Sequence, residues 1–258
     1  MNQSLAYIHP EAQIAEDVVI GPFVSIDKNV KIGKGTWIGS NVSIMEGARI
    51  GENCKIFPGA VISAVPQDLK FKGEDTIVEI GNNTTIRECV TINRATVARG
   101  VTSVGNNSLL MAYTHIAHDC EVKNNVIIGN ACQVAGEVVI DDFAILSGSI
   151  LVHQFVNIGA HVMISGGTLV RKDIPPYVTA AREPISYVGI NSVGLRRRNF
   201  ESKVINEITE VYRILYSGNY NNTDALLRIE KEIPFSIERD YIIKFIKDSK
   251  RGIMRGLN

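Results

Sequence analysis

Residues 104–170 have the sequence VGNNSLLMAYTHIAHDCEVKNNVIIGNACQVAGEVVIDDFAILSGSILVHQFVNIGAHVMISGGTLV. Every sixth residue in this stretch is aliphatic: Val104, Leu110, Ile116, Val122, Ile128, Val134, Ile140, Leu146, Val152, Ile158, Ile164 and Val170. A spacing of six matches neither an α-helix nor an alternating strand, and it is typical of the hexapeptide repeats of a parallel β-helix. The stretch therefore predicts triangular coils, in which each unit of six residues forms one short strand and one turn.

The same spacing extends toward the N-terminus. It is occupied by Ile8, Ile14, Ile20, Ile26, Ile32, Ile38, Ile44, Ile50, Ile56, Ile62, Ile80, Ile86 and Ile92. We expect these side chains to point inward and to stack on their equivalents in neighbouring coils. Burial of each one contributes roughly 1.5–3 kcal/mol before the loss of chain entropy is subtracted. The predicted fold class is therefore mainly β, a parallel β-helix of hexapeptide repeats.

A small or β-branched residue usually stands two positions before each aliphatic one, as at Ala48, Thr84 and Ala144. Such a side chain shares the interior of the coil. Three of the four cysteines occupy this position, namely Cys54, Cys120 and Cys132, so we expect buried thiols that pack as small hydrophobic groups. Cys89 lies outside it, and the spacing of the cysteines indicates neither a disulfide framework nor a zinc site.

Two polar segments interrupt the repeat. VPQDLKFKGED, residues 65–75, leaves two repeat positions without an aliphatic residue, and NRATVARGVTS, residues 93–103, leaves one. Because the spacing resumes in phase after each segment, both are predicted to be loops that project from one edge of the coil. Loops of this kind more often carry function than ordinary turns do.

The repeat ends near Val170, and the sequence DIPPY at residues 173–177 stops it because proline cannot join a strand ladder. We therefore predict a β-helix over residues 1–176 and a C-terminal α-helical domain over 177–258. One predicted helix has the apolar stripe Val204, Ile208, Val211 and Leu215 and ends at Gly218. The second has Thr223 or Asp224 as its N-cap, and the third opens on Ser236.

The formal net charge is zero, but residues 176–258 hold 14 Lys and Arg against 10 Asp and Glu. This surplus is too small for a nucleic-acid-binding protein and is compatible with an acidic partner. The sequence contains neither a signal peptide nor a long apolar run. We therefore expect a cytoplasmic protein without stable membrane insertion.

Three histidines stand at related positions of the long run of repeats: His115 and His118 in THIAHDC, and His153 in VHQF. With eighteen residues per coil, His118 is expected to stack with Gly136 and Gln154 of the next two coils on the outer surface. An imidazole followed directly by a carboxylate, Asp119, is suited to removing a proton from a hydroxyl. The alternative is that these are ordinary exposed turn residues.

Several longer motifs are similar to those of one family. QDLKFKGE, SLLMAYTHIAHDC, VHQFVNIGAHVMISGG, DIPPYV and GLRRRNF together resemble the UDP-N-acetylglucosamine O-acyltransferases, which catalyse the first step of lipid A biosynthesis. The resemblance implies a homotrimer of left-handed β-helices with active sites between subunits. It also implies transfer of an (R)-3-hydroxyacyl group from the phosphopantetheine of acyl carrier protein to the sugar 3-hydroxyl, with no bound cofactor and no metal.

The resemblance also implies roles for individual residues. His118 matches the general base, Asp119 the group that orients it, and Gly136 the glycine whose N–H faces the thioester oxygen. Gly166 matches the residue that closes the acyl groove, and a glycine there implies long donors. Substrate-binding positions are matched by Gln67, Asp68, Lys70, His115, His153, Gln154, Asn191, Arg197 and Arg198. The chain departs from the family pattern at Glu137 and Val193, which leaves substrate contacts at those two positions open.

Other functions remain compatible with the repeat. They are the N-acyltransferase of the same pathway, whose N-terminal uridine-binding domain has no counterpart in this sequence, and the coenzyme A-dependent acetyltransferases. A zinc-dependent β-helix carbonic anhydrase would use His115, His118 and His153 as ligands. A non-catalytic scaffold would use none of these motifs.

Overall fold

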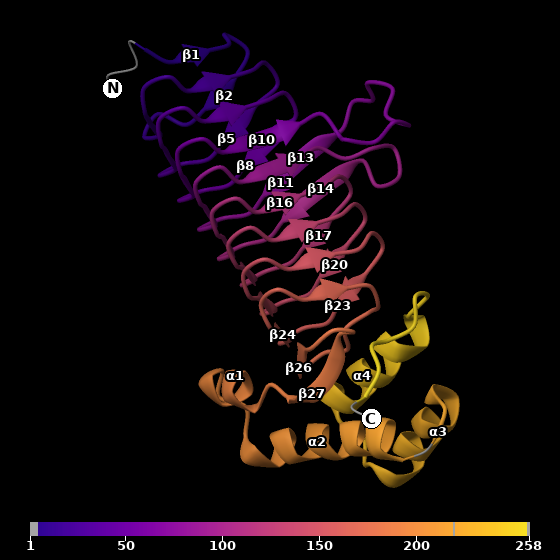
Figure 1. Cartoon of the computed structure of the whole chain (residues 1–258). Coiled ribbons are helices and arrows are strands. Elements are labelled where there is room, and N and C mark those ends of the chain that lie inside the picture. Colours follow the sequence, from indigo (N-terminus) through magenta and orange to yellow (C-terminus); the bar gives the residue numbers. More distant parts are fainter. Residues whose placement is uncertain (1–4, 219, 257–258) are drawn as a thin grey trace.

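The computed structural model describes residues 5–218 and 220–256, in which three parallel sheets wind around one core (Figure 1). The first sheet, sheet A, contains β1 (Tyr7–Ile8), β4 (Ser25–Ile26), β7 (Ser43–Ile44), β10 (Val61–Ala64), β13 (Thr91–Asn93), β16 (His115–Ile116), β19 (Gln133–Val134), β22 (Leu151–Val152) and β25 (Leu169–Val170). Sheet B contains β2 (Gln13–Ile14), β5 (Lys31–Ile32), β8 (Ala48–Ile50), β11 (Ile77–Ile80), β14 (Val101–Val104), β17 (Glu121–Val122), β20 (Val139–Ile140) and β23 (Asn157–Ile158).

Sheet C completes the triangle. Its strands are β3 (Val19–Ile20), β6 (Trp37–Ile38), β9 (Lys55–Ile56), β12 (Thr85–Ile86), β15 (Leu109–Leu110), β18 (Ile127–Ile128), β21 (Ile145–Leu146), β24 (Met163–Ile164), β26 (Val178–Ala181) and β27 (Ser186–Ile190). Each coil passes through the sheets in the order A, B, C. The three corners of the prism are therefore turns of type A–B, B–C and C–A.

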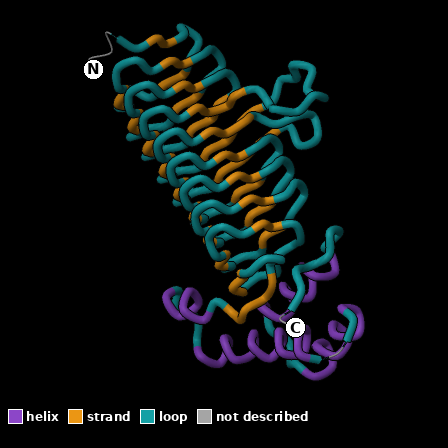
Figure 2. The backbone as a smooth tube through the Cα atoms, viewed as in Figure 1, coloured by secondary structure: helices purple, strands orange, loops and turns teal. Residues whose placement is uncertain are grey.

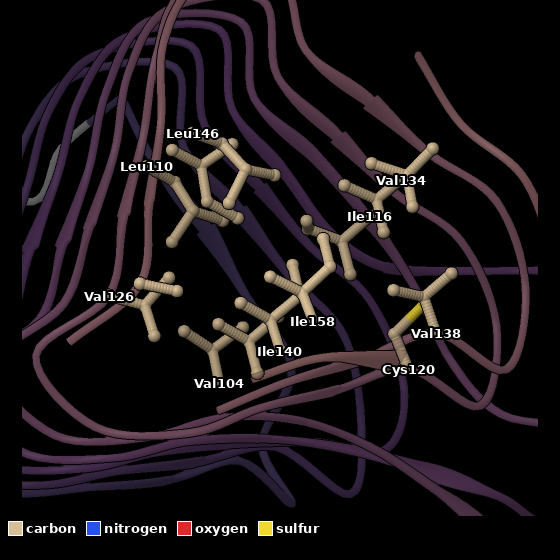
Figure 3. Close-up of a cluster of buried hydrophobic side chains, with 14 of the residues drawn as sticks. Val104, Leu110, Ile116, Cys120, Val126, Val134, Val138, Ile140, Leu146 and Ile158 are labelled. Atoms are coloured by element: carbon tan, nitrogen blue, oxygen red, sulfur yellow. The ribbon is translucent and has the colours of Figure 1, made fainter. Parts of the chain in front are cut away.

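The core confirms the six-residue spacing. From Ile20 onward the predicted aliphatic residues are buried, and those of successive coils stand in register, as Ile116 does on Val134 (Figure 3). Cys54, Cys120 and Cys132 are fully buried, as expected. In the first coils Ile8 and Ile14 are only partly buried, because no coil precedes them.

Both interruptions of the repeat leave the prism at the same A–B corner. The first connects β10 to β11 and the second connects β13 to β14. Figure 2 shows them side by side as the projections from the coil. Both polar segments therefore lie at one edge of the prism.

Sheet C continues beyond residue 176. β26 pairs in parallel with β24, and β27 then returns antiparallel to β26, so the last strand ends at Ile190. The two prolines of DIPPY stop the hexapeptide spacing, but the backbone beyond them still finds a ladder partner. Residue 176 therefore marks the end of the hexapeptide repeat, whereas sheet C continues beyond it.

Four helices close this end: α1 (Ser192–Arg197), α2 (Ser202–Ser217), α3 (Asn222–Glu232) and α4 (Ile237–Asp248). The apolar stripe of α2 is confirmed, with Ile208, Val211 and Leu215 buried and Gly218 at the C-cap. The predicted cap of α3 is wrong, because the Asn221 side chain accepts from the Asp224 N–H. Ser236 caps α4 as predicted. α1 lies on the side of the prism away from the two loops (Figure 1).

Candidate active site

His118 lies in the A–B corner between β16 and β17, beneath the two loops. Its Nδ1 is 2.7 Å from Oδ2 of Asp119, and its Nε2 is 3.9 Å from Oδ2 of Asp68 in the first loop. The distance to Asp68 is too long for a direct hydrogen bond, but one hydroxyl oxygen placed between them could contact both atoms. Because Nδ1 is engaged by Asp119, Nε2 is the nitrogen available to accept a proton from such a hydroxyl.

The expectation of an exposed imidazole is wrong. His118 is 8% exposed and Asp119 is fully buried. The second loop folds over this corner, so that Thr96 and Arg99 donate main-chain hydrogen bonds to the Asp119 carboxylate. The imidazole is consequently held in a fixed position, because its partner carboxylate cannot move.

The predicted column of outward positions is confirmed. The Glu137 N–H donates to the His118 carbonyl at 3.0 Å, and the Phe155 N–H donates to the Gly136 carbonyl at 3.1 Å. These bonds place Gly136 one coil beyond His118, with Gln154 in the coil after that. A Cβ built on Gly136 would lie 2.6 Å from both Cε1 and Nε2 of the imidazole. Glycine at this position is therefore required by the close approach of the ring.

His115 stands on β16 beside this pair. Its Nδ1 is 2.7 Å from Oγ1 of Thr91 on the neighbouring strand β13, which fixes the plane of the ring. Burial lowers the pKa of His115, and the nearby His118 lowers it further. Both effects favour the neutral imidazole.

The remaining residues predicted at this corner are more exposed. Gln67 and Lys70 lie on the surface of the first loop, where the Lys70 N–H donates to Oδ1 of Asp68 at 2.9 Å. His153 is exposed two coils away, with Nδ1 3.1 Å from the Gln154 carbonyl oxygen. The first loop therefore supplies Asp68 to the site with its carboxylate already oriented by its own backbone.

Other predicted site residues do not lie at this corner. Asn191 is buried as the N-cap of α1, and its Nδ2 donates to the His161 carbonyl at 2.9 Å, at a B–C corner. Arg198 donates to the Phe143 carbonyl at 3.2 Å, at the same kind of corner, while Arg197 is exposed. Gly166 lies at a C–A corner, where a built Cβ would be 3.0 Å from the Gly148 oxygen. Within one chain these groups and His118 face different directions.

Sequence reasoning missed two features. One is the set of contacts from Thr96, Arg99 and Thr102 to Asp119. The other is His161, which is stacked between Phe143 and Tyr177 at centroid distances of 4.9 and 5.6 Å. Burial, with a smaller contribution from Arg198, lowers the pKa of His161 to about 4. Phe143 and His161 occupy the same position at the B–C corner of two successive coils, and this spacing could have predicted that their rings stack.

Two family models match parts of the chain. One, for bacterial transferase hexapeptide repeats, matches residues 29–64 and 102–136, and one for domain 2 of UDP-N-acetylglucosamine O-acyltransferase matches residues 173–254. A curated acyl-[acyl-carrier-protein]–UDP-N-acetylglucosamine O-acyltransferase of Trichlorobacter lovleyi is 51% identical over 255 residues, covering 97% of this chain and 98% of the relative. The chain belongs to the UDP-N-acetylglucosamine O-acyltransferase family.

Solved structures of UDP-N-acetylglucosamine acyltransferases agree with this assignment. The structure from Bacteroides fragilis is 55% identical, with a TM-score of 0.97 over 99% of this chain and 100% of that one. The structure from Francisella novicida is 41% identical, with a TM-score of 0.96 over 99% and 94% of the two chains. The predicted fold class, a left-handed parallel β-helix followed by helices, is confirmed.

In the part of the chain that the structure describes, no helix has the length and apolar character needed to cross a membrane. Within the same residues, no three His, Cys, Asp or Glu side chains are grouped in a way that could hold a metal ion. The match to the O-acyltransferase family over nearly the whole chain favours acyl transfer over the carbonic anhydrase and scaffold alternatives.

Proposed function

We propose that the chain transfers an (R)-3-hydroxyacyl group from the phosphopantetheine thioester of acyl carrier protein to the 3-hydroxyl of UDP-N-acetylglucosamine. The observation that carries the proposal is the His118–Asp119 pair facing Asp68 across 3.9 Å, in a chain of this family. That arrangement provides one free imidazole nitrogen beside a carboxylate that can hold a sugar hydroxyl. In this proposal the acceptor sugar is surrounded by five further side chains: Gln67, Lys70, His115, His153 and Gln154.

The proposed reaction begins when Nε2 of His118 removes the proton of the 3-hydroxyl as its oxygen attacks the thioester carbonyl. Asp119, held by the second loop, stabilises the imidazolium that forms. The C–S bond then breaks, the ester remains on the sugar, and the imidazolium returns its proton to the departing pantetheine sulfur. A general base positioned in this way contributes roughly 10²–10⁴-fold in rate.

Gly136 is proposed to bind the oxygen of the tetrahedral intermediate. Its N–H donates no backbone hydrogen bond within the residues that the structure describes, and its carbon lies directly against the imidazole. A free N–H next to the base is suited to a developing oxyanion. Removing a donor of this kind typically lowers kcat by about 10²–10³-fold.

The donor separates this proposal from coenzyme A-dependent transfer by a protein of the same fold. We expect turnover of UDP-N-acetylglucosamine with 3-hydroxyacyl-acyl carrier protein and no turnover with acetyl-coenzyme A at the same concentration. Release of free thiol from each donor measures both reactions. Equal or faster use of acetyl-coenzyme A would reject the proposed donor.

We propose a homotrimer in which a neighbouring chain completes each site. The proposal is supported by the position of Asn191, Arg198 and Gly166 at corners other than that of His118. It is also supported by the apolar outer row of sheet C, where Leu109, Ile127, Ile145 and Met163 point away from the core. In an oligomer with closed cyclic symmetry, a face of this kind is covered by the neighbouring subunit.

Sedimentation tests the assembly. We expect a single species with three times the 28.3 kDa mass of one chain, and loss of activity on dissociation. The functional reason is that Asn191, Arg197 and Arg198 would reach the nucleotide and the pantetheine arm from another subunit. An active monomer at assay concentration would contradict the shared site.

We propose that Gly166 lies at the end of the acyl groove and that the chain prefers long donors. Glycine leaves the space open, and each additional buried methylene contributes roughly 0.8 kcal/mol, so donors of about fourteen carbons or more should be favoured. The backbone of Gly166 is not left-handed, so another residue is allowed there, although a Cβ would press on the Gly148 oxygen at 3.0 Å.

Gly166→Met should therefore shift the preferred donor to shorter chains by several carbons while turnover of those shorter donors continues. A set of hydroxyacyl carrier proteins of graded length measures the profile, and the melting temperature reports any damage from the tight contact. An unchanged length profile in a folded variant would show that the groove ends elsewhere.

A further inference from the structure

Four groups form hydrogen bonds with the Asp119 carboxylate, and three of them belong to the second loop. The Thr96 N–H donates to both oxygens at 3.1 Å, and the Arg99 N–H donates to Oδ1 at 3.0 Å. The Thr96 hydroxyl donates to Oδ2 at 2.7 Å, and the His118 ring contacts the same Oδ2 at 2.7 Å. Thr96 and His118 therefore share one carboxylate oxygen.

Sharing that oxygen has a direct electrostatic consequence. A hydrogen bond from Thr96 withdraws negative charge from Oδ2 and weakens the attraction of Asp119 for a protonated imidazole. Because Asp119 is fully buried, solvent does not replace the hydroxyl if it is removed. The Thr96 hydroxyl and the His118 ring thus compete for the charge of one carboxylate oxygen.

The second loop is itself anchored to the ends of the first loop. Nδ2 of Asn93 donates to the Val65 carbonyl at 3.0 Å, and the Arg94 N–H donates to the Ala64 carbonyl at 2.9 Å. At the other end Oγ1 of Thr76 donates to the Ala95 carbonyl at 2.5 Å. Thr96 therefore follows directly on backbone that is fixed to the loop that carries Asp68.

We propose that Thr96 is a positioning residue of the transfer reaction, acting on His118 through Asp119. The proposal rests on the proposed function, in which His118 is the base. Titratable groups near His118 include Asp119, Asp68 and His115, with Glu137 in the adjoining turn. Thr96 contacts only the first of these four, so its effect is separable from theirs.

The test compares the pH dependence of kcat/KM in three variants with the wild type. In Thr96→Val the shape of the side chain is kept and the hydroxyl is lost, so Asp119 holds the imidazolium more strongly. We expect the acid limb of this profile, where kcat/KM falls with decreasing pH, to move up by about 0.5 pH units. Below that limb kcat/KM should fall by about threefold, while KM for the nucleotide sugar changes little. Thr96→Ser keeps the hydroxyl and should restore the wild-type profile.

Thr102→Val is the matched control. Thr102 lies on β14, directly after the same loop, and is also buried. Its hydroxyl accepts from the Asp119 main-chain N–H at 2.8 Å, so the identical substitution removes a bond to the backbone of Asp119 and none to its carboxylate. This variant should melt at a lower temperature while its acid limb stays at the wild-type pH. The proposal is overturned if the acid limb of the kcat/KM profile shifts by the same amount in Thr96→Val and Thr102→Val. It is also overturned if the limb shifts in neither variant.

A second measurement needs no substrate. Diethyl pyrocarbonate modifies neutral imidazole, so the pH dependence of His118 modification, followed by peptide mass spectrometry, should move upward in Thr96→Val in the same way. If the wild type showed no acyl transfer, the proposed function would fail, and this measurement would still decide the role of Thr96. Identical modification curves for wild type and Thr96→Val would refute that role.

Discussion

Replacing His118 by alanine should lower kcat/KM for acyl transfer by about 10²–10⁴-fold, because the imidazole is the group that accepts the proton of the acceptor hydroxyl in the proposed reaction. The protein should remain folded and should keep the proposed trimeric assembly. The imidazole lies outside the prism, against Gly136 and the loops, and makes no part of the aliphatic core. Turnover with acyl carrier protein thioesters and the melting temperature are the two measurements.

His9→Ala is the matched control for this variant. His9 follows β1 at the same kind of A–B corner, several coils from the loops, and its Nδ1 accepts from the Glu11 N–H at 3.2 Å. Its removal should leave turnover unchanged. Near-normal activity of His118→Ala would reject the mechanism, whatever the behaviour of His9→Ala.

Gly136→Ala should lower kcat by about 10²-fold, since a displacement of the base by about 1 Å can have an effect of that size. The added Cβ would lie 2.6 Å from Cε1 and Nε2 of His118, so the ring must leave its place between Asp119 and Asp68. Gly136 is not in the left-handed region, so alanine adds no backbone strain there.

The loss should appear mainly in kcat, while the melting temperature reports the cost of displacing the buried ring. Gly148→Ala is a suitable comparison for stability, because its built Cβ has no neighbour closer than 3.3 Å and lies at another corner. A folded Gly136→Ala enzyme with wild-type kcat would show that the ring can be displaced without consequence.

The sequence predicted the β-helix because the inward position of each repeat allows little choice. From Ile20 to Val170 an aliphatic side chain stands at every sixth residue and fills the interior of the coil, and the exceptions at residues 68, 74 and 98 fall in the two loops. The stacking of His118 on Gly136 followed from the same period. The continuation of sheet C into β26 and β27 has no such signal, because these two strands pair without the hexapeptide spacing.

The burial of the candidate site could not be predicted in the same way. The bonds from Thr96 to Asp119 join residues 23 positions apart through an irregular loop, and no periodic pattern describes such a loop. The burial of Asn191 could not be predicted either, because its amide side chain caps α1 and donates to the His161 carbonyl. Motifs indicated which residues matter, whereas the fold determined which of them meet within one chain.

The central claim is that this chain forms an ester on the sugar 3-oxygen of UDP-N-acetylglucosamine. Purified wild-type protein should be incubated with that nucleotide sugar and a 3-hydroxyacyl-acyl carrier protein, and the product examined by tandem mass spectrometry. We predict a UDP-sugar heavier by one hydroxyacyl group, with the acyl chain attached at the 3-oxygen, and far less of this product from His118→Ala in the same time. Absence of this ester from the wild-type reaction, or acylation at another sugar position, would contradict the account.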